Sequence, residues 1–85
     1  DQGDNSFMNS DLKARHIAIH PNRSIFAVAL KKMIKIYFVT FNEIKVLKEI
    51  NVSMCGYLVF NHSGSLLTAV VTGKGGAKLY VHKIN

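Results

Sequence analysis

His16 and His20 lie four residues apart, the spacing at which two histidines on one face of a helix bind a common metal ion. Residues alternate in "RHIAIH", however, and this pattern indicates a strand. Four residues of strand span about 13 Å, too far for two imidazoles to bind one zinc ion at about 2 Å each. Pro21 also indicates that the chain turns there, and no third ligand is spaced nearby. We therefore predict structural or solvent-facing histidines and no metal site.

The glycine-rich segment "TGKGG", residues 72–76, could surround an anion with backbone N–H groups. A phosphate-binding P-loop has a glycine five residues before its Gly-Lys pair and a serine or threonine after it. Thr68 and Gly75 occupy these two positions here. We predict a flexible turn between two strands, and an anion-binding turn remains the alternative.

Cys55 is the single cysteine, and His62 follows it by seven residues, so a nucleophile with a base has to be considered. No nearby carboxylate can orient His62, and nothing in the sequence pairs Glu43 with Glu49 as acid and base. A lone cysteine before a strand is usually a small buried apolar residue. We predict that the protein is not an enzyme and binds no cofactor. One cysteine also excludes an intramolecular disulfide, which suits a reducing compartment.

The charge distribution is strongly basic after the first eleven residues. The chain of 85 residues has eleven Lys and Arg against five Asp and Glu, a net charge of +6. Three of the acids, Asp1, Asp4 and Asp11, lie at the start. Such a balance favours an anionic partner, whether nucleic acid, an acidic protein surface or anionic lipid.

No charged residue interrupts the segment from Ile50 to Gly73, which is long enough to cross a bilayer at about 20 residues. The sequence "NHSGS", residues 61–65, would place a polar turn at the bilayer centre, where its backbone groups would find no water. We therefore predict two strands joined by a surface turn, and no membrane partner. If neighbouring sheets cover both faces of this pair, the chain alone leaves apolar faces exposed, so we expect the native protein to be larger.

The remaining segments are typical of an all-β protein. "RHIAIH", "IFAVAL" and "MIKIYFV" have the β-branched and aromatic residues that favour strands, and turn residues separate them. "NEIKVLKEI" is compatible with a short helix or an outer strand, and we favour the strand. "GYLVF", "LLTAVV" and "KLYVH" then repeat the earlier order of elements.

The repeat has a period of 41 to 43 residues. Ser24 falls on Ser65 at a shift of 41, and Lys35 falls on Lys78 at a shift of 43, so the glycine-rich turn holds two additional residues. A period of about 40 to 45 residues with several short strands is typical of the four-stranded blades of β-propellers.

The segments "IAIHPNRSIFAVAL" with "IKIYFV", and "LVFNHSGSLLTAVV" with "AKLYVHK", resemble WD repeats over residues 15–83. "KEINVSMCGYLVFNHSGSLLTAVV" is similar to the degenerate blades of ciliary WD-repeat proteins, in particular the cilia- and flagella-associated protein 57 family. The Trp-Asp strand ends are replaced by Phe38-Val39 and Val81-His82, and only Thr68 matches a position of the family's hydrogen-bond network. Blade rigidity must therefore come mainly from apolar packing.

The resemblance implies an all-β fold of about two four-stranded antiparallel blades of a WD-repeat β-propeller, part of a larger ring. Residues 1–14 would be a linker or the end of a preceding blade, residues 15–50 one blade, and residues 51–85 a second blade without its outer strand. Phe7 and Met8 are the candidates for an outer strand of that preceding blade.

The same resemblance implies a non-catalytic scaffold in the cytoplasm and cytoskeleton, at the axoneme of cilia and flagella. Its expected partners are other axonemal proteins, inner dynein arm components and tubulin, with regulatory complexes held on doublet microtubules. A small-molecule substrate is not expected. The alternative is a small basic β-domain of ribosomal or OB-like type that binds nucleic acid, although such a domain has no reason to repeat one unit.

Lysines recur at equivalent places in the two units and are the candidate partner-binding residues. They are Lys31, Lys32 and Lys35 in the first unit, and Lys74 and Lys78 in the second. Turns at one end of neighbouring blades lie side by side, so these side chains would form one basic patch. An acidic protein surface is the preferred partner and nucleic acid the second, while charges that serve only solubility remain the simpler interpretation.

Overall fold

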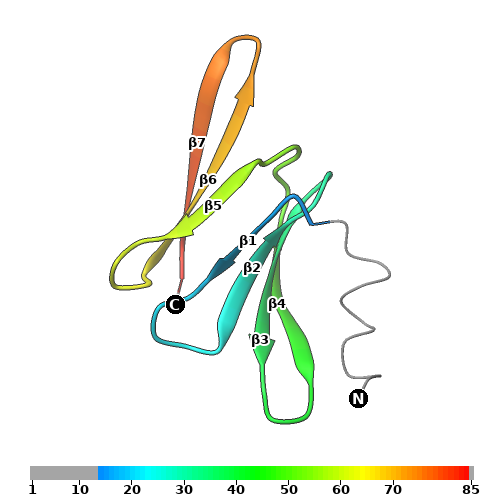
Figure 1. Ribbon diagram of the computed structural model, residues 1–85, viewed down its shortest axis with the longest axis vertical. Coiled ribbons are helices and arrows are strands. Elements are labelled where there is room, and N and C mark those ends of the chain that lie inside the picture. Colours follow the sequence, from blue (N-terminus) through cyan, green and yellow to red (C-terminus); the bar gives the residue numbers. More distant parts are fainter. Residues whose placement is uncertain (1–13, 85) are drawn as a thin grey trace.

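The computed structural model describes residues 14–84, which form seven strands and no helix (Figure 1). The strands are β1 (His16–Ile19), β2 (Ile25–Ala29), β3 (Ile34–Val39), β4 (Ile44–Ile50), β5 (Tyr57–Phe60), β6 (Leu66–Gly73) and β7 (Gly76–Lys83). The predicted all-β class is confirmed, and the ambiguous segment after β3 is a strand. The predicted role of Phe7 and Met8 falls outside the described residues.

The strands form two antiparallel sheets, each with its strands in chain order. Sheet 1 has the order β1-β2-β3-β4 and sheet 2 the order β5-β6-β7. The chain passes from β4, at one edge of sheet 1, to β5, which packs beside β1 and β2. In Figure 1, β1 and β5 run in the same direction, so equivalent turns of the two sheets lie at the same end of the molecule.

The repeat extends to individual hydrogen bonds in the first turn of each sheet. The backbone N–H of His20 donates to the carbonyl oxygen of Ile25 at 2.9 Å, and that of Asn61 donates to Leu66 at 3.0 Å. Both partners are displaced by 41 positions, as the sequence predicts. The strand pairs β1-β2 and β5-β6 are therefore equivalent residue by residue.

The third strand of each sheet has a larger offset than the sequence alignment suggests. The Val39 N–H donates to Ser24 and the Ile84 N–H donates to Ser65, each at 2.8 Å. The serines differ by 41 positions but Val39 and Ile84 differ by 45. The shift of 43 is therefore wrong by two residues, because the β6-β7 hairpin is longer by four residues.

This slip leaves each side chain on its expected face, since side chains alternate along a strand with a period of two. It changes which residues are equivalent, however. Lys35 pairs across the sheet with Val28, whereas Lys78 pairs with Val71, two residues nearer to the hairpin tip. The structural counterpart of Lys35 is thus Tyr80.

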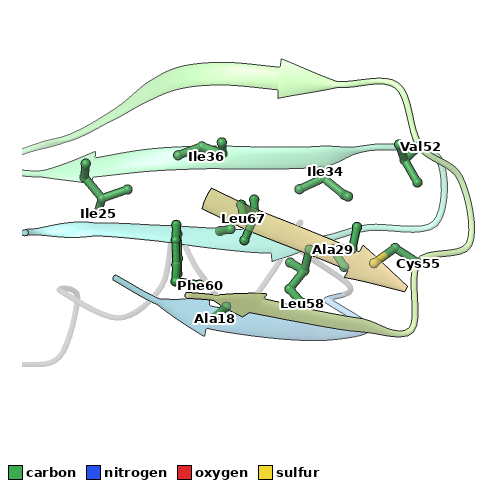
Figure 2. Close-up of a cluster of buried hydrophobic side chains, with 12 residues drawn as sticks. Ala18, Ile25, Ala29, Ile34, Ile36, Val52, Cys55, Leu58, Phe60 and Leu67 are labelled. Atoms are coloured by element: carbon green, nitrogen blue, oxygen red, sulfur yellow. The ribbon is translucent and has the colours of Figure 1, made fainter. Parts of the chain in front are cut away.

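The hydrophobic core lies between the two sheets (Figure 2). Register places Ala18, Ala27 and Ile36 side by side on β1, β2 and β3, where the two alanines let sheet 2 approach closely. From sheet 2, Phe60 and Leu67 are neighbours across β5 and β6. The other members of the core are Ile25, Ala29, Ile34, Val52, Cys55, Leu58 and Ala69.

Each sheet also has an outer face that exposes large apolar side chains, and on sheet 1 this face further holds the buried Val28 and Tyr37 and the Lys35–Glu49 ion pair. On sheet 1, Ile17 and Ile19 are 46% and 76% exposed, and on sheet 2 Leu79 and Val81 are 67% and 62% exposed. The prediction that the chain exposes apolar faces is confirmed. Within residues 14–84 there is no helix of the length and apolarity that a bilayer span requires.

Candidate interaction surfaces

His20 and Gly64 join the first turn of sheet 1 to the first turn of sheet 2. His20 is buried, with 6% of its surface exposed. Its Nδ1 atom accepts hydrogen bonds from the backbone N–H groups of Asn22 at 3.0 Å and Arg23 at 3.1 Å. The ring hydrogen is therefore on Nε2, which donates to the Gly64 carbonyl oxygen at 2.9 Å. We call this contact the His20 junction.

Gly64 is required at this junction for two reasons. Its φ of +80° belongs to the left-handed region that side chains disfavour. A Cβ atom at Gly64 would also lie 2.3 Å from atoms of the His20 ring, which is held in place by its own hydrogen bonds and by an edge contact with Phe60. The glycine of "NHSGS" thus serves the packing of two sheets as well as its own turn.

His16 makes a second contact between the sheets. Its Nδ1 atom accepts a hydrogen bond from the backbone N–H of Leu58 at 3.1 Å, and its ring packs on Tyr57 with centroids 4.8 Å apart. Both histidines therefore have structural roles between the sheets, which is one of the two predicted alternatives. No local pattern in the sequence indicates that each ring contacts the other repeat.

The turn "NHSGS" is fixed by the side chain of Asn61. Its Oδ1 atom accepts the Leu66 N–H at 2.9 Å, and its amide nitrogen donates to the hydroxyls of Ser63 and Ser65 at 3.3 and 3.1 Å. The two hydroxyl oxygens are themselves 2.9 Å apart. A polar cleft of about 330 Å³ separates this turn from the first turn of sheet 1, with Arg23 on its wall.

Cys55 lies in the connection between the sheets and is fully buried in the core. Its thiol donates to the Tyr57 carbonyl oxygen at 3.1 Å, and its own carbonyl accepts the Arg15 Nε–H at 3.3 Å. The predicted small buried cysteine is confirmed. Beside it, the Met54 N–H donates to the carbonyl of Lys31 at 2.8 Å, which holds the connection against the β2-β3 turn.

The candidate lysines occupy corresponding turns but differ in their surroundings. Lys31 and Lys32 lie in the exposed β2-β3 turn, and Lys74 lies in the exposed β6-β7 turn. Lys35, on β3, is 3.6 Å from the Glu49 carboxylate of β4. Lys78 is exposed on β7. The three turn lysines therefore lie at one end of the molecule, whereas the charge of Lys35 is partly balanced within its sheet.

The segment "TGKGG" forms the tip of the β6-β7 hairpin, so the predicted turn between two strands is confirmed. Gly73 pairs with Gly76, and Lys74 and Gly75 form the tip. Gly76 has a φ of +110°, which a side chain would strain. A depression of about 300 Å³ on this hairpin is bordered by Thr72 and by Lys78 among others. The alternative of an anion-binding turn stays a prediction.

His82 is a further residue of interest that the sequence analysis did not single out. It lines a small hollow between the sheets together with Ile36 and Lys48. Partial burial, and then the positive charge of Lys48, lower the pKa of His82 below its usual value of 6.5. No local motif marks this pair, because Lys48 and His82 belong to different sheets.

A scan against protein-family models and a search of curated proteins both found no match to this chain.

Proposed function

We propose that this chain is part of a β-propeller scaffold that holds protein partners through its turns and catalyses no reaction. One observation carries the proposal: two sheets with equivalent strand pairing pack face to face, and each has a second face on which large apolar side chains remain exposed. A soluble domain rarely exposes apolar surface on two opposite sides unless further elements cover it. In a propeller, further blades would cover both faces.

The contacts between the sheets suit a scaffold. The His20 junction and the His16 contact tie the two sheets together at backbone groups, and the core includes closely packed alanines. Such a stack presents its turns in fixed relative positions. The turn side chains can then differ from one protein to another without disturbing the packing.

The proposed site of interaction is the end of the molecule that carries Lys31, Lys32 and Lys74, with Lys35 and Lys78 on the adjoining strands. Long flexible cations on exposed turns favour an acidic protein surface. We further propose an axonemal role, in which the protein positions inner dynein arms and regulatory complexes on doublet microtubules. Support for this finer proposal comes from the sequence resemblance and from the match between a basic surface and the acidic outer surface of microtubules.

The proposal is tested by sedimentation of the full native polypeptide with purified doublet microtubules. We expect cosedimentation that weakens between 50 and 200 mM salt, because the contact is electrostatic. The triple variant Lys31→Gln/Lys32→Gln/Lys74→Gln should reduce binding about tenfold, since three weak charge contacts of about 0.5 kcal/mol each sum to about 1.5 kcal/mol.

The control is Lys45→Gln/Lys48→Gln/Lys83→Gln, which removes the same charge from β4 and the end of β7. It should bind as the unmodified protein does. Equal losses of affinity in the two triple variants would show that binding depends on net charge and not on the lysines of these turns. A stronger, salt-dependent binding to RNA or DNA than to microtubules would favour a nucleic-acid-binding β-domain instead.

A further inference from the structure

The two outer faces are the repeat-related counterparts of the two faces that meet in the core. In the core, the face of sheet 1 that carries Ala18 and Ala27 packs on the face of sheet 2 that carries Phe60 and Leu67. Faces that the repeat makes equivalent therefore differ in their surroundings. The face that is buried in sheet 1 has its equivalent on the exposed side of sheet 2. The core thus shows how two such faces pack together. A face equivalent to each of them also lies on the outside of the molecule.

The outer face of sheet 2 corresponds to the buried face of sheet 1. By the observed register, Ala18 corresponds to Val59 and Ile36 to Val81. The exposed or half-buried side chains of this outer face are Tyr57, Val59, Leu66, Thr68, Val70, Thr72, Ala77, Leu79, Val81 and Lys83. Lys83, at the end of β7, is the charged member of this face, and the other side chains are uncharged and mostly apolar.

The outer face of sheet 1 corresponds to the buried face of sheet 2. Ile17 is the counterpart of Leu58, Ile19 of Phe60 and Phe26 of Leu67, and in each pair the two side chains are large and apolar. An open depression of about 400 Å³ is lined on this face by Ile17, Ile19, Phe26 and Val39, and Arg23 also borders it.

We propose that these two outer faces bind each other between chains, so that sheet 1 of a second copy packs on sheet 2 of the first. The observed core interface is the template for this contact. Because the two faces differ, the contact is heterologous: each copy that joins leaves one face of each kind free, and assembly continues as a ring or a filament. The proposal rests on the stacking of the sheets and deepens the proposed propeller, because the further blades that cover both faces would then come from other copies of this chain. It does not depend on the microtubule role.

Two differences make the contact between chains weaker than the core. Thr68 and Val70 are larger than their counterparts Ala27 and Ala29, so the sheets stand further apart. The polar junction also has no equivalent, because Asn61 replaces His20 and uses its side chain within its own turn. The association should therefore depend on concentration.

The test is sedimentation velocity of the purified 85-residue chain over a hundredfold range of concentration. We expect the unmodified chain to form species larger than a dimer as concentration rises. Ile19→Glu, on the outer face of sheet 1, and Val81→Glu, on the outer face of sheet 2, should each remain monomeric at all concentrations. Both side chains are strongly exposed, so the folded chain tolerates the change, which circular dichroism verifies.

Mixing the two variants distinguishes a heterologous contact from a symmetric one. Ile19→Glu retains an intact sheet 2 face and Val81→Glu an intact sheet 1 face, so an equimolar mixture should form a 1:1 dimer and nothing larger. Phe41→Glu is the control, since Phe41 is fully exposed on the β3-β4 turn, away from both faces. It should assemble as the unmodified chain does.

Three results would overturn the proposal. The unmodified chain could stay monomeric at every concentration, which would show that a second copy does not cover these faces. Either variant could still dimerise alone, which would indicate a symmetric contact. The mixture could stay monomeric. In each case microtubule binding by the full polypeptide would still decide the proposed function separately.

Discussion

The Nε2 atom of His20 lies 2.9 Å from the carbonyl oxygen of Gly64, although 44 positions separate the two residues in the chain. The approach depends on both partners. The His20 ring is held by two backbone N–H groups of its own turn, and Gly64 has no side chain to keep the ring away. This polar contact, together with the His16 contact and the apolar core, therefore sets the relative position of the two sheets.

Replacing Gly64 with alanine should destabilise the chain by about 2 to 5 kcal/mol. The left-handed backbone costs an alanine about 1 to 2 kcal/mol, and the collision of its Cβ with the His20 ring costs a further 1 to 3 kcal/mol. Urea unfolding followed by circular dichroism measures the change. Gly56→Ala is the matched control, because no atom lies within 4 Å of a Cβ built there. Equal effects of the two substitutions would contradict the close approach.

His20→Ala tests whether the collision is with this ring. The single substitution should cost about 2 to 3 kcal/mol, because it leaves backbone groups of two turns without their partner. In the double variant with Gly64→Ala, the new methyl group meets no ring, so its additional cost should fall to that of the backbone strain alone. The coupling energy from the four urea midpoints should thus be about 1 kcal/mol or more. If the losses of unfolding free energy in the two single variants simply add in the double variant, the strain of Gly64→Ala does not come from the His20 ring.

The elements and their repetition could be predicted from the sequence because local patterns carry them. Strand propensity, turn residues and the recurrence of Ser24 at Ser65 depend on neighbours along the chain. The outer strand β4 was the difficult element, since its side chains are mostly exposed and its apolar residues follow no clean period. Pairing with β3, rather than its own pattern, makes it a strand.

The contacts between sheets could not be predicted in the same way. The offset of the third strand was misjudged by two residues, because matching Lys35 to Lys78 compares residue types and ignores hydrogen bonding. The sequence does not distinguish a structural from a solvent-facing role for His20, since its hydrogen-bond acceptor is a carbonyl of the other repeat. Backbone acceptors leave no trace in the sequence, so such junctions appear only in three dimensions.

Burial of Cys55 predicts a thiol that reacts only when the chain opens. Reaction with a soluble thiol reagent should be slower in buffer than in urea by roughly a hundredfold, which corresponds to an opening free energy of about 3 kcal/mol. The control is Ser53→Cys in the Cys55→Ala background, which moves the thiol two residues along the same connection to an exposed position. That thiol should react at similar rates in both solvents. Fast reaction of native Cys55 would mean that the connection does not cover it.

Stability should decrease as pH falls below about 6.5, and His82 should contribute to this decrease. Partial burial and then Lys48 lower the folded-state pKa of His82, so between that pKa and 6.5 the unfolded chain binds more protons than the folded chain. This stabilising contribution is fully present above pH 6.5, decreases progressively as pH falls from 6.5 to the folded-state pKa, and changes no further below that pKa.

His82→Gln should flatten this part of the profile of urea midpoint against pH. Lys48→Gln should reduce the pH dependence and leave the part that is due to burial. Lys45→Gln, on the same strand and next to Glu43, supplies the matched loss of charge and should keep the profile of the unmodified chain. A profile that His82→Gln does not change would show that the hollow between the sheets leaves this imidazole as hydrated as in the unfolded chain.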